Sequence, residues 1–352
     1  MTAMRPLPLR TLAGSIVDVA TPATLAALVV AALASGAGPV LAHGAVPAEA
    51  PTVGSFVLDW TFEPAVALPL LVAAVGWLRI VGRVDQAHPA SPVPRRRTVA
   101  FLAGLAAIAV ALLSGIDAYD TTLFSVHMVQ HLLLTLVAAP LIALGAPITT
   151  LLRASSPDVR RRIILPILHS RVMKVLSFPV VAWLVFAGVM WGTHFSPLFD
   201  ASLENPLVHD LEHALFLGAG LLFWWPAVGL DPSPWRMPHP VRAMYVFLQM
   251  PQNTFLAVTI LNSSVVLYQH YATLGRTWGP TVLEDQQIAG GLMWITGDIL
   301  FLVGLAAILA GWMAHDQRQT AAADRRVDAE RAAILSRERR LAERLAGERE
   351  GR

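Results

Sequence analysis

The chain has 352 residues, of which 55% are hydrophobic and only 14% are charged, and its mean hydropathy is positive. Soluble proteins carry roughly a quarter of charged residues, so this composition excludes a soluble globular protein and predicts an integral membrane protein. The chain contains no cysteine, which excludes disulfides and thiolate metal sites. The formal net charge of +2 says little about partners because the charges are crowded into a few segments, and no nucleic-acid partner is expected.

The amino-terminal segment 1–42 has the pattern of a signal peptide. Two arginines precede an apolar stretch, and "GPVLAHG" ends it with small residues at Val40 and Ala42. We expect cleavage after Ala42; the alternative is an uncleaved signal anchor, which adds one span. Both alternatives place residue 43 outside. Cleavage would make His43 the first residue, and its α-amine and imidazole would then form an additional copper(II) site. The alternative is an ordinary loop histidine.

The segment 43–315 is expected to form a transmembrane domain. A helix needs about 20 apolar residues to cross a bilayer, and seven such runs follow residue 43. They lie near 64–82, 98–116, 123–147, 175–193, 208–228, 241–266 and 286–313. Because every backbone polar group in lipid needs an internal partner, we predict an all-α bundle of seven transmembrane helices. Pro251 interrupts the run 241–266 and predicts a kink there, with Gln252 and Asn253 inside the membrane.

The loops alternate in charge along the chain. The loops 83–97, 148–174 and 229–242 are rich in arginine, whereas 43–63, 117–122, 194–207 and 267–285 carry mainly carboxylates. The positive-inside rule therefore places the mature amino terminus outside and the charged tail, 316–352, in the cytoplasm. The tail is rich in Ala, Glu and Arg and is expected to be helical. Val327, Ile334 and Leu341 are spaced seven residues apart, as in a coiled coil. A solvated helix, or one that lies along the membrane surface, is nevertheless favoured over a coiled coil.

Histidines gather at the predicted outer ends of the helices. "HMVQH" (127–131) and "HDLEH" (209–213) each place two histidines four residues apart, so both imidazoles of a pair share one helix face. His194 ends another span at the same depth, and Glu212 lies on the face of the second pair. Helical bundles build transition-metal sites from such donors on facing helices. We therefore predict a metal site; the alternative is hydrogen bonding in a hydrated vestibule.

One further carboxylate lies at this level. Asp285 begins the last span, where an aspartate usually caps its helix, but this side chain is expected to point toward the histidine layer.

Three functional classes remain open after the residues have been placed. A chain that handles a metal is favoured over an enzyme, because the sequence has no nucleophile–base constellation and no nucleotide loop. A haem-binding redox protein would use one member of each histidine pair, since two imidazoles on one helix face cannot both serve one iron. A metal transporter would need polar residues below the histidine layer, and Gln252 and Asn253 are the candidates. Imidazole-rich sites favour copper among divalent ions, although zinc is also permitted.

Five ordered motifs carry a resemblance to a known family. They are "HMVQHLLLTLVAAPLIALGAP", "WGTHFSPLFD", "HDLEHALFLGAGLLFWWPAVG", "LYQHYA" and "EDQQIAGGLMW". Over roughly residues 56–313 the chain resembles the CtaG family of bacterial cytochrome c oxidase assembly factors. An unrelated single-span copper chaperone shares that name, but it bears a cysteine motif that this chain lacks.

The resemblance implies a multi-pass protein of the bacterial plasma membrane that acts in haem–copper oxidase maturation, at the copper step. It implies cytochrome c oxidase subunits and copper chaperones as partners, with membrane lipids around the bundle. It also implies that the family's recurring polar positions are His127, His131, His194, His209, Glu212, His213 and Asp285.

Overall fold

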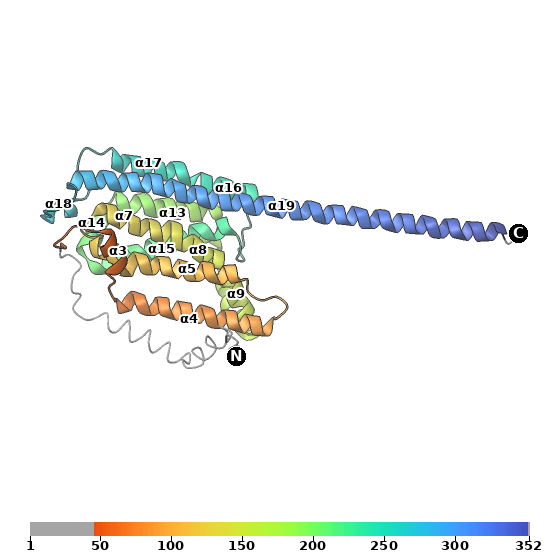
Figure 1. Cartoon of the computed structure of the whole chain (residues 1–352). Coiled ribbons are helices and arrows are strands. Elements are labelled where there is room, and N and C mark those ends of the chain that lie inside the picture. Colours follow the sequence, from red (N-terminus) through yellow and green to blue (C-terminus); the bar gives the residue numbers. More distant parts are fainter. Residues whose placement is uncertain (1–45, 351–352) are drawn as a thin grey trace, which may run out of the picture. The chain divides into compact units, whose positions relative to one another are not determined.

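The structure is a computed structural model that describes residues 46–350, except for the side chains of 57–58 and 341–350. The predicted signal segment 1–42 and His43 therefore lie outside the described residues. Every regular element in the described range is a helix (Figure 1), which confirms the all-α prediction. The chain divides into two compact units, Met1–Gly304 and Leu305–Arg352.

The helices of the first half run in this order: α3 (Val53–Leu58), α4 (Pro64–Ala87), α5 (Arg95–Leu113), α6 (Gly115–Tyr119), α7 (Phe124–Leu132), the π-helical η1 (Leu133–Ala138), α8 (Ala139–Gly145) and α9 (Pro147–Ala154). A basic connection follows, made of α10 (Pro157–Val159), the π-helical η2 (Arg160–Ile164), α11 (Leu165–Leu168) and α12 (Arg171–Leu176). The remaining elements are α13 (Pro179–His194), α14 (Leu198–Glu204), α15 (Pro206–Val228), α16 (His239–Phe247), α17 (Gln249–Leu261), α18 (Gln269–Thr273) and α19 (Val282–Glu350).

Five helical segments of the described chain are long and apolar enough to cross a membrane, or six if the bent pair α13 and α14 forms one span. The predicted number of seven is therefore not confirmed. The difference lies at 241–266, where the expected helix is divided at Leu248 into α16 and α17. Pro251 explains the division, because it lacks an N–H and its ring clashes with the carbonyl four residues earlier, at Phe247.

Small residues let the central helices of the first unit approach closely. α5 lies beside α4 and α8, and α15 lies beside α8 and α13. A Cβ added to Gly104 of α5 would lie 2.7 Å from the Ile142 side chain, and one added to Gly220 of α15 would lie 3.0 Å from the Ala139 Cβ. Such close contacts at glycine are common where membrane helices pack, and here they hold η1 and α8 between α5 and α15.

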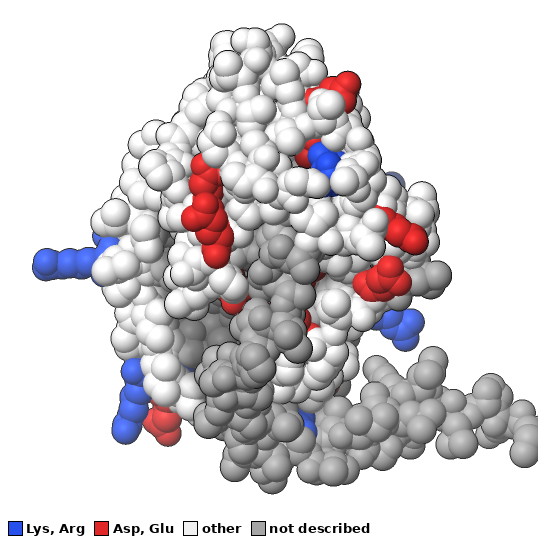
Figure 2. Space-filling view, turned by 90° about the vertical axis from the view of Figure 1, so that its left-hand side faces the viewer, with Lys and Arg blue, Asp and Glu red and all other residues white. Residues whose placement is uncertain are grey.

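The two sets of predicted loops occupy opposite ends of the first unit. α3, α14 and α18 lie at one end, and α9 lies at the other (Figure 1). Figure 2 views the end that holds α18 and shows Asp and Glu side chains on it, with most of the visible Lys and Arg toward its margins. The acidic and basic loops are thus separated in space, and their orientation in a membrane stays a prediction.

The second unit contains the carboxyl-terminal part of α19. Its described residues are helical through Glu350. Val327 and Ile334, two of the residues that recur at seven, are exposed.

Candidate metal centre

The first histidine helix, α7, is held at its amino end by a residue from α19. The Asp285 carboxylate accepts hydrogen bonds from the Phe124 backbone N–H at 2.7 Å and from the Ser125 hydroxyl at 2.5 Å. The first N–H groups of a helix have no partner within it, so Asp285 caps α7 from another helix. The structure thus places Asp285 at the amino end of the helix that carries His127. Asp285 belongs to neither of the two groups of side chains in the described residues whose ligand atoms lie close enough to share a metal ion.

The two histidine pairs converge inside the first unit. His127 and His131 come from α7, His209 and His213 come from α15, and all four are buried. The ring centroids lie 4.2 Å apart in the first pair and 4.3 Å in the second, and 5.3 Å separates the rings of His127 and His209. The ring centroid of His194, at the end of α13, lies 6.2 Å from that of His131. We call these five residues the histidine cluster.

Two carboxylates complete close groups of ligand atoms around His127. Asp120, His127 and His209 form one group, and His127, His131 and Glu212 form the other; in each, the ligand atoms lie within 4.8 Å of one another. The Glu212 Oε2 is 3.7 Å from the His127 Nε2, and the Asp120 Oδ2 is 3.6 Å from the His209 Nε2. Ligands about 2.0–2.2 Å from an ion are at most roughly 4.4 Å apart, so small side-chain movements would close either group around one ion.

Two imidazoles of the cluster have unused hydrogen-bonding capacity. Within the described residues, neither ring nitrogen of His127 or His131 has a hydrogen-bond partner. Buried polar side chains usually have such partners, and an exception calls for an explanation such as an ion. His131 also stacks on Phe216 with the ring centroids 3.8 Å apart, which holds its ring in place. The residues present therefore fit a metal ion.

Two further histidines of the cluster, His213 and His194, are oriented by polar neighbours. The His213 Nε2 bonds to the Gln130 Oε1 at 2.9 Å, and the Gln130 Nε2 donates to the Ala111 carbonyl at 3.0 Å. The His194 Nδ1 bonds to the Met190 carbonyl at 2.7 Å. Partners of this kind fix the tautomer and the direction of imidazoles that bind metals. The cluster thus combines imidazoles in fixed orientations with imidazoles whose nitrogens have no hydrogen-bond partner among the described residues.

Sequence reasoning missed Asp120 and Gln130 as parts of this site. Asp120 is completely buried; this burial, followed by the nearby charge of Asp117, raises its pKa well above the ordinary value. A cation beside the carboxyl would favour its charged form. The available signal was that Asp120 lies in a very short predicted outer segment, 117–122, shortly before "HMVQH". The charge pattern alone does not distinguish it from an ordinary loop carboxylate.

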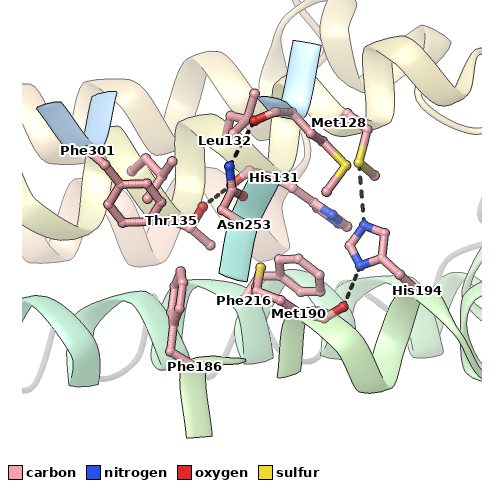
Figure 3. Close-up of a pocket in the computed structure, with 12 residues that line it drawn as sticks. Met128, His131, Leu132, Thr135, Phe186, Met190, His194, Phe216, Asn253 and Phe301 are labelled. Atoms are coloured by element: carbon pink, nitrogen blue, oxygen red, sulfur yellow. Dashed lines mark hydrogen bonds between the residues drawn. The ribbon is translucent and has the colours of Figure 1, made fainter. Parts of the chain in front are cut away.

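Two cavities adjoin the cluster. One of about 280 Å³ is lined by Glu63, Asp117, Asp210 and His213 among others, and a cleft lined by charges of one sign attracts the opposite ion. The other has a volume of about 20 Å³ and is lined by three methionines together with His131 and His194 (Figure 3). The larger cavity therefore gives cations a route to His213 that is lined in part by carboxylates. His131 and His194 border the smaller cavity, which methionine side chains also line.

Comparison with known proteins places the chain in a family. The family model described as cytochrome c oxidase caa3 assembly factor (CtaG) matches residues 75–315. Uncharacterized proteins of Mycobacterium bovis and Mycobacterium tuberculosis are each 30% identical over 287 residues, covering 80% of this chain, and one of Mycobacterium leprae is 30% identical over 286 residues, covering 79%. The chain spans 43% of the length of each relative. No solved structure matches the chain. Because the family model covers more than half of its length, the chain belongs to the caa3 cytochrome c oxidase assembly factors.

Proposed function

We propose that this chain takes part in cytochrome c oxidase assembly by binding copper in the histidine cluster and presenting it at the extracytoplasmic face of the plasma membrane. Membership of the assembly-factor family supports the role in oxidase assembly. The observation that carries the copper site is the pair of buried imidazoles, His127 and His131, whose nitrogens have no hydrogen-bond partner in the described residues and lie beside Glu212.

The donor set suits a metal that is held and passed on. Neutral imidazoles and carboxylates bind both copper and zinc, and copper(II) binds such donors most tightly among the divalent first-row ions. Packing favours a bare ion over haem, because the His131 ring stacks on Phe216 and the His127 ring lies 5.0 Å from Phe199. A flat macrocycle would have to separate these rings. The proposed role is therefore binding and delivery without catalysis.

The proposed topology follows from the same features. We propose that α13 with α14, and α16 with α17, each form one bent span, which gives seven spans in a bacterial plasma membrane. The histidine cluster and the acidic cavity would then open outward, and the tail would lie in the cytoplasm. Cytochrome c oxidase subunits and copper chaperones are the proposed partners at the outer face.

Metal analysis of the purified full chain tests the copper site. We expect the wild type to bind copper(II), and His127→Ala and His131→Ala each to lower the affinity at least tenfold, because each removes a ligand from the close groups. His169→Ala is the matched control, since His169 is exposed in the basic connection, and it should bind copper like the wild type. Equal copper binding in all four proteins would contradict the site, and preferential retention of zinc would contradict the choice of metal.

Oxidase activity tests the assembly role. In a strain lacking the gene, the wild-type chain should restore cytochrome c oxidase activity, whereas His131→Ala should insert into the membrane without restoring it. Added copper should partly rescue that variant. Normal oxidase activity in the deletion strain would contradict the assembly role even if the purified protein bound copper.

Metal transport is a second candidate, favoured by polar groups beyond the cluster. Asn253 lines the small cavity together with His131 and His194. Its amide donates to Asp298 at 3.3 Å, and the Thr254 hydroxyl donates to the same carboxylate at 2.8 Å. Asp298 was not recognised in the sequence as part of such a path. Copper uptake into vesicles containing the wild type, lost in Asp298→Asn, would support transport; vesicles without uptake would exclude it.

A further inference from the structure

The small cavity beside the histidine cluster has donors of a different chemical kind. Met128 of α7, Met190 of α13 and Met293 of α19 line it, together with His131 and His194. All five side chains are buried, and the volume of about 20 Å³ is enough for one water-sized particle. Thioethers from three helices therefore meet imidazoles around a space that suits a single ion.

The contact between Met128 and His194 brings together two groups that have lone pairs. The His194 Nε2 lies 3.5 Å from the Met128 Sδ (Figure 3). The other ring nitrogen, Nδ1, is 2.7 Å from the Met190 carbonyl, which only accepts hydrogen bonds, so Nδ1 carries the proton of a neutral ring. The Nε2 atom is then an acceptor, and a thioether has no proton to give it.

A neighbouring hydroxyl does not change this assignment. The Thr193 hydroxyl lies 3.3 Å from the His194 Nδ1, but it donates to the Val189 carbonyl at 2.8 Å. Its oxygen is therefore an acceptor toward Nδ1. A second proton on the buried His194 ring would give Nε2 a hydrogen to donate, but it would also leave a charge in an apolar cavity at high cost. A cation shared by the two lone pairs is the alternative.

The distance between the two donors is suitable for such an ion. With bonds of roughly 2.0 Å to nitrogen and roughly 2.3 Å to sulfur, as in zinc sites, donors 3.5 Å apart subtend roughly 110° at the metal. This is the angle of a tetrahedral site. Met190 and Met293 line the same cavity and supply further thioethers. Soft thioether ligands are among those that favour copper(I).

We infer that Met128 and His194 bind one copper(I) ion in this cavity, separately from the imidazole–carboxylate groups around His127. The inference deepens the proposed function and rests on it for the choice of copper. The chain would then have two adjacent environments, one with carboxylates and one with thioethers, that share the buried histidine cluster.

X-ray absorption of the purified full chain loaded anaerobically with copper(I) tests the inference. In the wild type we expect sulfur and nitrogen neighbours around copper. In Met128→Leu we expect a smaller sulfur contribution, because one of the thioethers is removed, and at least a tenfold weaker affinity for silver(I), a redox-inert probe. Leucine fills nearly the same volume as methionine, and size-exclusion chromatography and circular dichroism check folding. Met244→Leu is the matched control because Met244 is 56% exposed, and it should keep the sulfur signal.

The outcomes separate this inference from the proposed function. Copper held only by nitrogen and oxygen in the wild type would overturn the thioether site and leave the histidine site standing. An unchanged sulfur signal in Met128→Leu would also overturn it. No copper binding in either oxidation state would overturn both proposals together.

Discussion

Both ends of the first unit carry polar side chains, but these are buried at one end and exposed to solvent at the other. At the end near α14 and α18, Asp120, His127 and His209 are 1% exposed or less. At the end near α9, the basic connection leaves Arg161, Arg162 and Arg171 exposed. Exposed arginines are the basis for predicting which end of a membrane protein faces the cytoplasm. Buried polar groups need partners, and those without one in the described residues are candidates for binding a ligand. Charge counting alone describes only the basic end.

The largest expected effect comes from removing the cap that holds the buried end together. Asp285→Ala leaves the Phe124 N–H and the Ser125 hydroxyl without their acceptor. Hydrogen bonds to a charged group contribute about 1.5–3 kcal/mol, so we expect the free energy of unfolding to fall by about that amount. Copper binding should weaken as well, because α7 carries His127. Thermal unfolding in detergent and copper titration measure the two effects.

Glu284→Ala is the control for this cap. The neighbouring carboxylate is exposed and accepts hydrogen bonds only from Thr281 in the described structure. It should leave copper affinity unchanged. If Asp285→Ala behaved in the same way as this control, α7 would not depend on α19, and the contrast between the two ends would lose its structural basis.

The next effect concerns Asp120, the buried carboxylate that sequence reasoning missed. Asp120→Ala should weaken copper binding about 10–100-fold, the usual cost of removing a group that ligates or orients a metal site. Asp59→Ala removes an exposed carboxylate from a predicted outer segment and should have no effect. Calorimetric titration compares the variants. Equal affinities would show that burial at this end does not mark function.

A smaller effect is expected midway between the ends, where α15 meets η1. A Cβ at Gly220 would lie 3.1 Å from the Thr135 Cα and 3.0 Å from the Ala139 Cβ, so Gly220→Ala should lower the free energy of unfolding by about 1 kcal/mol through overpacking. Gly218→Ala is the matched control in the same helix, because nothing lies within 4 Å of its added Cβ. It should be neutral or stabilising by up to about 1 kcal/mol. Thermal unfolding of the two variants distinguishes packing from helix propensity.

The smallest effect is expected at the basic end. Arg162→Ala should change the free energy of unfolding by less than about 0.5 kcal/mol, as exposed substitutions usually do, and should leave copper affinity unchanged. Thermal unfolding and copper titration again give the measurement. A tenfold loss of copper affinity in this variant would show that the two ends are coupled.

Local patterns in the sequence predicted the all-helical fold and the shared faces of the histidine pairs. The spacing of His127 and His131 fixes their common face because it depends only on the helical repeat. Matched depth on two spans then predicted that both pairs would meet. The break before Pro251 was also predictable, since proline disrupts the bond to the carbonyl four residues earlier.

The contacts that complete the site depend on residues far apart in the chain. Gln130 meets His213 across 83 positions, and Asp285 meets Phe124 across 161. No periodicity within one helix encodes such pairs. The same limit applies to Asp285: its expected direction followed from its depth, whereas the structure shows that its carboxylate accepts hydrogen bonds from the start of α7. The division of 241–266 into two short helices likewise left the number of spans open.

The π-helical segment η1 has a consequence for the register of its helix. It follows α7 directly and precedes α8, and a π turn holds one more residue than an α turn. Winding the same residues, Leu133–Ala138, as an ordinary α-helix would remove this extra residue per turn and rotate α8 by about 100° relative to α7. The residues of α8 that face α5 and α15 would then turn away while the histidines stayed in place. The π-helical turn thus changes which face of the helix points inward. The face of α7 that carries His127 and His131 points into the histidine cluster, and the face of α8 that packs against Gly104 and Gly220 points toward α5 and α15.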